Sequence, residues 1–198
     1  MKLTDAKRDY FRKLSKEEGY RSRSAYKLAQ LDKSYHILKA KSSVVDIGSA
    51  PGGWLQVAKR ATSLGKVIGV DILNVAPIEG VTILKGDIED THTINLPIQT
   101  VNGKADTLLS DVSPTVSGIW NVDHAKQISL SEKSLTIATK VLVRGGNAIL
   151  KVFEGELLKE FRKETEKHFS RVLLTKPLAS RQQSSELYMV CLGFEYNR

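Results

Sequence analysis

Carboxylates and glycines that could bind a small molecule recur where short apolar runs of the sequence end. Asp46, Asp71, Asp87 and Asp111 each close or follow such a run, and the glycine-rich stretch Gly48–Gly53 comes directly after the first. A glycine-rich turn lets a ligand approach the backbone and exposes N–H groups at the start of the next helix. One strand-end aspartate alone usually only caps a helix. Four of them around one such turn indicate a ligand that offers hydroxyls, amino groups or a positive charge.

The spacing of the glycines separates this turn from two common nucleotide-binding motifs. The order is G-x-x-x-G-G with Pro51 inside it, not the G-x-G-x-x-G of dinucleotide-binding proteins, and no Gly-Lys-Ser/Thr of a P-loop follows. Carboxylates also suit a cationic sulfonium cofactor better than the phosphates of NAD or ATP. A tight turn without any ligand is the alternative.

The elements that must position these residues alternate along the chain. Short runs rich in β-branched residues indicate buried strands, and longer amphipathic stretches between them indicate helices. This order predicts an α/β fold with a mostly parallel, seven-stranded sheet and helices on both faces, whose ligands bind outside the carboxyl ends of the strands. Strands are expected at Ser43–Ile47, Lys66–Asp71, Val81–Leu84, Ala105–Ser110, Asn147–Val152, Arg171–Thr175 and Leu187–Phe194. Helices are expected at Asp5–Glu18, Ser22–Leu31 (capped by Ser22), Trp54–Ser63, Val122–Val143 (ended by Arg144-Gly145-Gly146) and Glu156–His168.

Composition places the 198-residue chain among ordinary globular proteins, with 41% hydrophobic and 26% charged residues. We expect one domain, residues 1–198, with a basic helical segment at about residues 1–41. Cys191 is the single cysteine, which excludes an internal disulfide and fits a reducing compartment. No signal peptide or membrane-spanning run is evident in the sequence, so we expect a cytoplasmic protein, acting as a monomer without membrane partners.

Positive charge is concentrated near the N-terminus. Residues 1–41 hold twelve Lys or Arg and five acids, so they account for seven of the eight net positive charges. Aromatic residues lie among these charges, and basic residues mixed with aromatics favour RNA as a partner. A solvated helical face, with the aromatics packing on the core, is the alternative. Our candidates for phosphate contacts are Arg21, Arg23 and Lys7–Lys16.

Five segments, in order along the chain, resemble the motifs of one enzyme family. The segment Asp46–Gly53 (DIGSAPGG) with Trp54 resembles the cofactor motif of the FtsJ-type (RrmJ-type) ribosomal RNA 2′-O-ribose methyltransferases. The similarity covers about residues 20–194. The four other matching segments are Arg21–Leu28, Ser110–Pro114 with Ser117-Gly118, Leu150–Phe153, and Ser180-Arg181 with Ser184–Tyr188.

The resemblance implies an activity and a set of site residues. The activity is transfer of a methyl group from S-adenosylmethionine to a ribose 2′-hydroxyl of RNA, in a Rossmann-like methyltransferase fold. In this family the substrate is a uridine of large-subunit ribosomal RNA, as free RNA or in the large ribosomal subunit; close relatives methylate the tRNA anticodon loop, which stays an alternative. The family's catalytic Lys-Asp-Lys-Glu tetrad falls on Lys27, Asp111, Lys151 and Glu186, and its cofactor contacts fall on Gly52, Gly53, Trp54, Asp71, Asp87 and Asp111.

The residue types of this tetrad suit methyl transfer. Methyl transfer is an in-line displacement, so the enzyme must align a hydroxyl with the methyl group and deal with the hydroxyl proton. Lys151, at the end of a strand, is our candidate for the group that receives or orients that proton. Burial and the second cation Lys27 favour an uncharged lysine, whereas Asp111 and Glu186 favour a charged one, and the sequence leaves both states open.

Other chemistries have less support in the sequence. The histidines His36, His92, His124 and His168 show no metal-ligand spacing, and methyl displacement needs no metal, so we expect none. Three classes of protein stay open as alternatives: a non-catalytic RNA-binding protein on the same fold, a small-molecule methyltransferase and, more distantly, an NAD-dependent enzyme.

Overall fold

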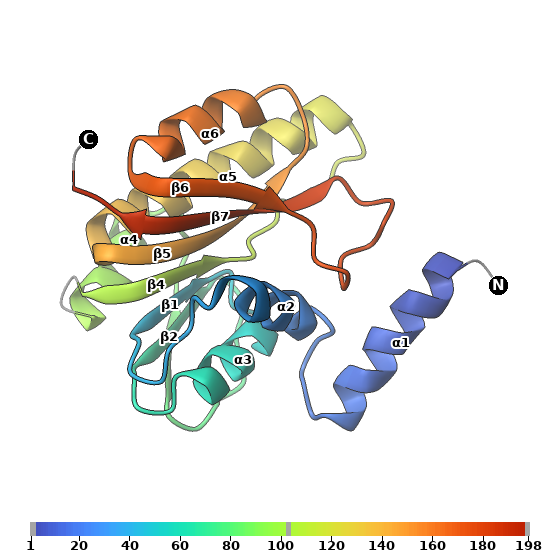
Figure 1. Ribbon diagram of the computed structural model, residues 1–198, viewed down its shortest axis with the longest axis horizontal. Coiled ribbons are helices and arrows are strands. Elements are labelled where there is room, and N and C mark those ends of the chain that lie inside the picture. Colours follow the sequence, from blue (N-terminus) through green and yellow to red (C-terminus); the bar gives the residue numbers. More distant parts are fainter. Residues whose placement is uncertain (1–2, 102–103, 197–198) are drawn as a thin grey trace.

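A seven-stranded sheet forms the centre of the computed structural model, which describes residues 3–101 and 104–196 (Figure 1). The strand order is β3-β2-β1-β4-β5-β7-β6. All neighbouring pairs from β3 to β5 are parallel, and β7 is antiparallel to both β5 and β6. The strands are β1 Val44–Ile47, β2 Val67–Asp71, β3 Val81–Lys85, β4 Ala105–Ser110, β5 Leu142–Phe153, β6 Phe169–Thr175 and β7 Glu186–Phe194.

Helices cover both faces of this sheet (Figure 1). The helices α2 (Ala25–Tyr35) and α3 (Gly53–Ala61) pack on one face, and their apolar side chains share a core with Tyr188 of β7. The helices α4 (Thr91–Thr100), α5 (Trp120–Val141) and α6 (Leu158–Glu166) lie on the other side, where residues of α5 and α6 share the second core with the central strands. This double cover explains why all four residues of β1 are buried.

The order of the strands reverses between β1 and β4. From β1 the chain builds outward through β2 to β3, and it then returns to place β4 on the other side of β1. In open parallel sheets a ligand binds outside the carboxyl ends of the strands at such a switch point. The ends of β1 and β4 carry the glycine-rich turn and Asp111, so we expect the ligand site at this edge of the sheet.

The helix α1 (Leu3–Glu17) stands apart from the body of the molecule, on the side of the carboxyl ends of the parallel strands (Figure 1). From Tyr10 onward, where its side chains are described, it contacts α2 through the Phe11 and Tyr26 rings, whose centroids lie 5.3 Å apart. Tyr20, in the connection between the two helices, lies 5.5 Å from the same Tyr26 ring. Three of the N-terminal aromatics therefore take the packing role, while Tyr10 is 60% exposed.

Most predicted boundaries agree with the structure to within two residues, two predictions were wrong, and one helix was missed. The second helix runs from Ala25 to Tyr35, and Ser22 does not cap it, because its Oγ lies 2.6 Å from Ser24 Oγ instead. The fifth strand begins at Leu142, since Gly145 (φ 81°) continues the strand through a register shift and does not end a helix. The helix α4 was not predicted, because it carries Pro97 and has neither an acidic first turn nor a basic last turn.

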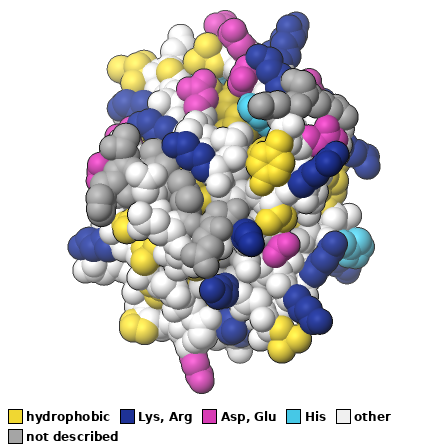
Figure 2. Space-filling view, turned by 90° about the vertical axis from the view of Figure 1, so that its left-hand side faces the viewer, with side chains coloured by type: hydrophobic (Ala, Val, Ile, Leu, Met, Phe, Trp, Pro, Cys, Tyr) yellow, Lys and Arg dark blue, Asp and Glu magenta, His cyan; other side chains and the backbone are white. Residues whose placement is uncertain are grey.

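The face at the amino ends of the parallel strands shows no single sign of charge. Figure 2 views the molecule from this side, and both basic and acidic side chains occur across the part of the surface that is coloured. Within the described residues, no helix is both long and apolar enough to cross a membrane.

Candidate active site

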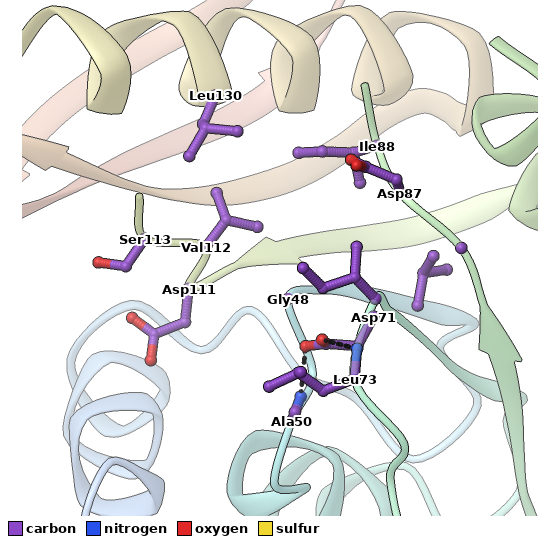
Figure 3. A pocket seen from close by; sticks show the side chains of 13 residues that line it. Gly48, Ala50, Asp71, Leu73, Asp87, Ile88, Asp111, Val112, Ser113 and Leu130 are labelled. Carbon is purple, nitrogen blue, oxygen red and sulfur yellow. Dashed lines mark hydrogen bonds between the residues drawn. The ribbon is translucent and has the colours of Figure 1, made fainter. Parts of the chain in front are cut away.

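A pocket of about 330 Å³ opens at the carboxyl ends of β1, β2, β3 and β4. Three carboxylates line it, Asp71, Asp87 and Asp111, and none of its thirteen described lining residues is Lys or Arg. Figure 3 shows these carboxylates around the pocket, together with the glycine-rich turn and Val112. Three of the predicted cofactor contacts therefore lie around one cavity of the size that small-molecule sites have.

Backbone N–H groups fix the carboxylate of Asp71. Its Oδ2 accepts the N–H of Ala50 at 2.7 Å, and its Oδ1 accepts that of Leu73 at 2.8 Å (Figure 3). Each carboxylate oxygen can accept about two hydrogen bonds, so lone pairs remain for ligand hydroxyls. Asp87 is held in a similar way, since its Oδ1 accepts the N–H of Glu89 at 2.8 Å.

Gly48 begins the turn in the left-handed region, with φ at 73°. A Cβ at this position would lie 2.6 Å from the Val112 side chain and 2.9 Å from the Val112 backbone, so no other residue fits without moving the segment after β4. Glycine here therefore lets the end of β1 approach the segment that carries Asp111.

The three other residues predicted from the cofactor motif lie away from the pocket lining. A Cβ on Gly52 would lie 2.9 Å from the Arg21 guanidinium, and one on Gly53 would lie 2.4 Å from Ser22 Oγ. Trp54 is buried and donates from Nε1 to the carbonyl of Ser24 at 2.9 Å. In this structure all three hold the segment before α2 in place, and their contact with a cofactor stays a prediction.

Asp46, on β1 two residues before Gly48 of the pocket, is a fully buried carboxyl group. Neither of its oxygens has a hydrogen-bond partner among the described residues. Burial raises the pKa of Asp46 well above its usual range, and the nearby charges of Asp111 and Asp71 raise it further. A buried carboxyl that is left unsatisfied is costly to stability, which is typical of functional sites.

Lys151, buried at the end of β5, contacts Asp111 at the end of β4. Its Nζ donates to the Asp111 backbone carbonyl at 2.7 Å and to the Asp111 carboxylate at 3.0 Å. The backbone of Lys151 is fixed from the other side by α5, because its carbonyl accepts from Ser131 Oγ at 2.8 Å and from Gln127 Nε2 at 3.0 Å. The lysine is therefore held both at its Nζ and at its backbone.

Lys27 and Glu186 form the second half of the site. Lys27 lies buried on α2, and its Nζ donates to Glu186 Oε1 at 2.6 Å. The same carboxylate oxygen accepts from Ser180 Oγ at 2.9 Å. The ion pair thus joins α2 to the start of β7, and a serine of the preceding connection orients its carboxylate.

Tyr188 joins the two ion pairs, and sequence reasoning did not single it out. Its hydroxyl donates to Asp111 Oδ1 at 2.7 Å and accepts from Lys27 Nζ at 3.2 Å. Burial raises the pKa of Tyr188 well above its usual range, with the charges of Asp111 and Glu186 adding to the effect, so the phenol keeps its proton. The four residues predicted as the tetrad therefore form one continuous network through a fifth side chain.

The donor set of the pocket fits a cationic organic cofactor. Three carboxylates favour a positive charge and hydrogen-bond donors, and the absence of Lys and Arg among the described lining residues disfavours a phosphate group. Across the described residues, no three His, Cys, Asp or Glu side chains are grouped as a metal site would require.

Comparison with known proteins identifies the family. The model of the FtsJ-like methyltransferases matches residues 20–194. The chain belongs to the FtsJ-like methyltransferase family. A protein of Nitrosopumilus maritimus named Ribosomal RNA large subunit methyltransferase E is 52% identical over 98% of this chain and 99% of its own length. One of the same name from Cenarchaeum symbiosum is 48% identical over the same shares.

A solved structure agrees with this assignment. A Plasmodium falciparum protein whose crystal structure is described as that of a ribosomal RNA methyltransferase superposes with a TM-score of 0.80 at 32% identity, covering 90% of this chain and all of the other. The FtsJ-like chain thus has the Rossmann-like methyltransferase fold and is a methyltransferase. The membership and the fold predicted from the sequence motifs are confirmed.

Proposed function

We propose that this FtsJ-like methyltransferase transfers a methyl group from S-adenosylmethionine to a ribose 2′-hydroxyl of large-subunit ribosomal RNA. The observation that carries the proposal is the continuous network from Lys151 through Asp111, Tyr188 and Lys27 to Glu186, which adjoins a pocket lined by carboxylates. Asp111 belongs to both, so the place where a hydroxyl would be oriented touches the place where the methyl donor would bind.

Asp71, Asp87 and Asp111 would hold the cofactor. S-adenosylmethionine, when bound, supplies an electrophilic methyl group on a positively charged sulfur. The fixed carboxylate of Asp71 suits the two hydroxyls of a ribose, Asp87 suits an adenine amino group, and Asp111 places negative charge at the end of β4. Gly52, Gly53 and Trp54 would support this pocket by fixing the segment before α2.

Lys151 would act on the attacking hydroxyl. Its Nζ is fixed by two contacts to Asp111, which defines one position for the proton that the hydroxyl must lose. A group in this position would orient the hydroxyl toward the methyl donor and would receive or stabilise its proton, while the methyl group's bond to sulfur breaks and its bond to oxygen forms. Lys27 and Glu186 would position the ribose, since their ion pair lies across Tyr188 from Asp111.

The substrate follows from the similar proteins. Two relatives that match nearly the whole chain carry large-subunit ribosomal RNA in their names. The basic segment at residues 1–41 supports RNA as the polyanion, and ribosomal RNA as substrate supports a cytoplasmic location. We further propose that the sheet and its helices form one methyltransferase domain, to which α1 is attached.

Methyl transfer to defined RNAs tests the proposal. Labelled S-adenosylmethionine is supplied with large-subunit ribosomal RNA, large ribosomal subunits and tRNA in parallel, and 2′-O-methyl products are mapped. Label on ribosomal RNA or subunits is expected. Label on tRNA alone would retain the enzyme and replace its substrate, whereas cofactor binding without any label would favour a non-catalytic RNA-binding protein.

A further inference from the structure

A second hollow lies beside the network and shares no residue with the cofactor pocket. It measures about 390 Å³, within the range of ligand sites. One wall is the C-terminal half of α2, and the other is the end of β6 with the connection that leads to β7. Its lining residues are Gln30, Leu31, Lys33, Ser34, Tyr35, Thr175, Lys176, Pro177 and Leu178.

Both walls of the hollow continue directly from the residues of the network. Gln30 follows Lys27 by three residues on α2, a rise of about 4.5 Å along the helix. Thr175 is the cross-strand partner of Tyr188. Gln30 Oε1 accepts the N–H of Ala179 at 3.0 Å, so the two walls are tied together next to Ser180, which bonds Glu186. The hollow is therefore held in a fixed position relative to the proposed site of the ribose.

The side chains of the hollow match a nucleotide. Lys33 and Lys176 are exposed, and none of the nine lining residues is Asp or Glu. Lys176 is oriented by two bonds within the β6–β7 connection, because its Nζ donates to the carbonyls of Gln182 and Ser184, and its third N–H remains for a phosphate. Tyr35 offers a partly buried ring, and Leu178 is 76% exposed at the rim. Cations for phosphate beside an aromatic and an apolar surface for a base are the usual composition of single-strand RNA sites.

Charge separates this hollow from a third one on the opposite face of the sheet. The third hollow, of about 240 Å³, lies between α5 and α6 and is lined by Glu132, Glu164 and His168 with three uncharged residues. Two carboxylates would repel a phosphate. Among these hollows, the one at α2 and β6 alone combines positive charge with contact to the network.

We propose that the hollow between α2 and the β6–β7 connection binds the nucleotide next to the one that is methylated, in single-stranded RNA. This inference rests on the proposed function. The target ribose lies at the network, and the neighbouring base enters the hollow against Tyr35 and Leu178 while its phosphate meets Lys33 and Lys176. Splaying two neighbouring nucleotides in this way would present the 2′-hydroxyl between them to Lys151.

Oligouridylates of one to six nucleotides test the inference by length. Their dissociation constants are measured at saturating S-adenosylhomocysteine for the wild type, Lys33→Gln and Leu178→Asp. The matched controls are Lys66→Gln and Leu64→Asp, two exposed positions at the amino ends of the strands, where Leu64 is 73% exposed. We expect both hollow variants to weaken hexamer binding about tenfold, with unchanged affinity for the mononucleotide and for S-adenosylhomocysteine. Both controls should match the wild type.

Two further measurements complete the test. KM for large-subunit ribosomal RNA should rise in the hollow variants while kcat stays within about twofold, and a 4-thiouridine hexamer should crosslink to α2 or to residues 175–178. Equal hexamer affinity in all five proteins would overturn the inference and would not affect the proposed function. The hollow would then be a candidate site for a peptide of a protein partner. A wild type that binds S-adenosylhomocysteine but no oligouridylate and methylates no RNA would overturn both.

Discussion

At the scale of single residues, a substitution of Lys151 gives the most direct test of the proposed mechanism. Lys151→Ala removes the Nζ that contacts Asp111 twice. We expect a loss of kcat of at least about 10²-fold, the usual contribution of a group that handles a proton in the transition state. S-adenosylhomocysteine affinity should change little, because Lys151 does not line the cofactor pocket.

A matched control for this variant is Lys140→Ala, an exposed lysine at the end of α5. Steady-state methyl transfer and calorimetric cofactor binding measure the two quantities separately. Near-normal turnover of Lys151→Ala would remove Lys151 from the mechanism.

Tyr188→Phe deletes one oxygen from the centre of the network and keeps the ring that packs on Trp54. Asp111 and Lys27 then lose a shared partner in a buried site. We expect kcat to fall about tenfold, corresponding to about 1.4 kcal/mol, with KM for the cofactor unchanged. Unchanged kcat would show that the two ion pairs act independently of each other.

Asp46 provides a residue-scale test of stability. Its raised pKa means that the folded state holds the proton more tightly than the unfolded state does. The stability that the protonated form contributes is present below the unfolded pKa, near 3.9, and is lost as pH rises through the folded pKa. Asp46→Asn should therefore raise the free energy of unfolding at pH 7.5 by about 1 kcal/mol or more relative to the wild type, and by less at pH 4.

Denaturant unfolding of the ligand-free protein at both pH values measures this difference. The exposed Glu79→Gln is the control, for which we expect no such dependence on pH. An equal effect of Asp46→Asn at pH 4 and pH 7.5 would contradict a folded-state proton on Asp46.

At the scale of elements, the strands were predictable because their signal is local. Seven apolar runs gave the seven strands, and strand-end carboxylates gave three residues of the pocket. Tyr188 was missed because its role depends on partners 77 and 161 residues away in the sequence, which no local pattern reveals. The position of Gly145 misled the prediction for a different reason: a glycine after a helix indicates a helix end, and only the strand register shows that it continues β5.

Arg21 contacts two segments beside the cofactor pocket, the glycine-rich turn after β1 and the segment after β2. Its guanidinium donates to the carbonyls of Pro51, Ala76 and Pro77, so it holds the segment after β2 against the glycine-rich turn. This contact set gives Arg21 a structural task, and its phosphate contact stays a prediction. We expect Arg21→Ala to weaken S-adenosylhomocysteine binding about 5- to 30-fold, because residues of the released segment line the pocket.

The matched control for Arg21 is Arg60→Ala. Arg60 lies 4.3 Å from the Tyr20 ring and bonds the carbonyl of Glu18, so it supports the same N-terminal segment without touching the segment after β2. Isothermal titration of S-adenosylhomocysteine into the wild type, Arg21→Ala and Arg60→Ala measures the loss of affinity in each variant. An equal loss in both variants would mean that general loosening of the N-terminal segment, and not the carbonyl contacts, controls the pocket.

The contact between α5 and the start of α6 should be sensitive to pH. His124 accepts the N–H of Leu157 through Nε2 at 3.1 Å, and burial lowers the pKa of His124, with Glu156 opposing the shift. A lowered folded pKa means that the unfolded state binds the proton more tightly, so stability is complete above about pH 6.5 and falls as pH drops below it. The slope of unfolding free energy between pH 6.5 and 5 should be shallower in His124→Gln than in the wild type, as unfolding measured at several pH values would show.

At the scale of the whole molecule, charge is distributed unequally between two ends. The amino ends of the strands show both signs of charge (Figure 2), whereas α1 projects on the side of the carboxyl ends (Figure 1). Arg12, Lys13 and Lys16 of α1 are exposed. Phe11 and Tyr26 pack against each other, which agrees with the alternative that the aromatics only pack this segment on the core. The three cations, in contrast, face solvent on the same side of the molecule as the pocket.

The salt dependence of RNA binding tests whether α1 contacts phosphates. Each phosphate contact on a single strand contributes about 0.7 to the slope of log affinity against log salt. Arg12→Gln with Lys16→Gln should therefore reduce the slope by about 1.4. The same two-charge change at Lys66 and Lys140, which lie away from α1, should leave the slope unchanged. A slope in the α1 variant equal to that of the wild type would place the RNA elsewhere, and the cations around the α2 and β6 hollow would then have to carry the electrostatic part of binding.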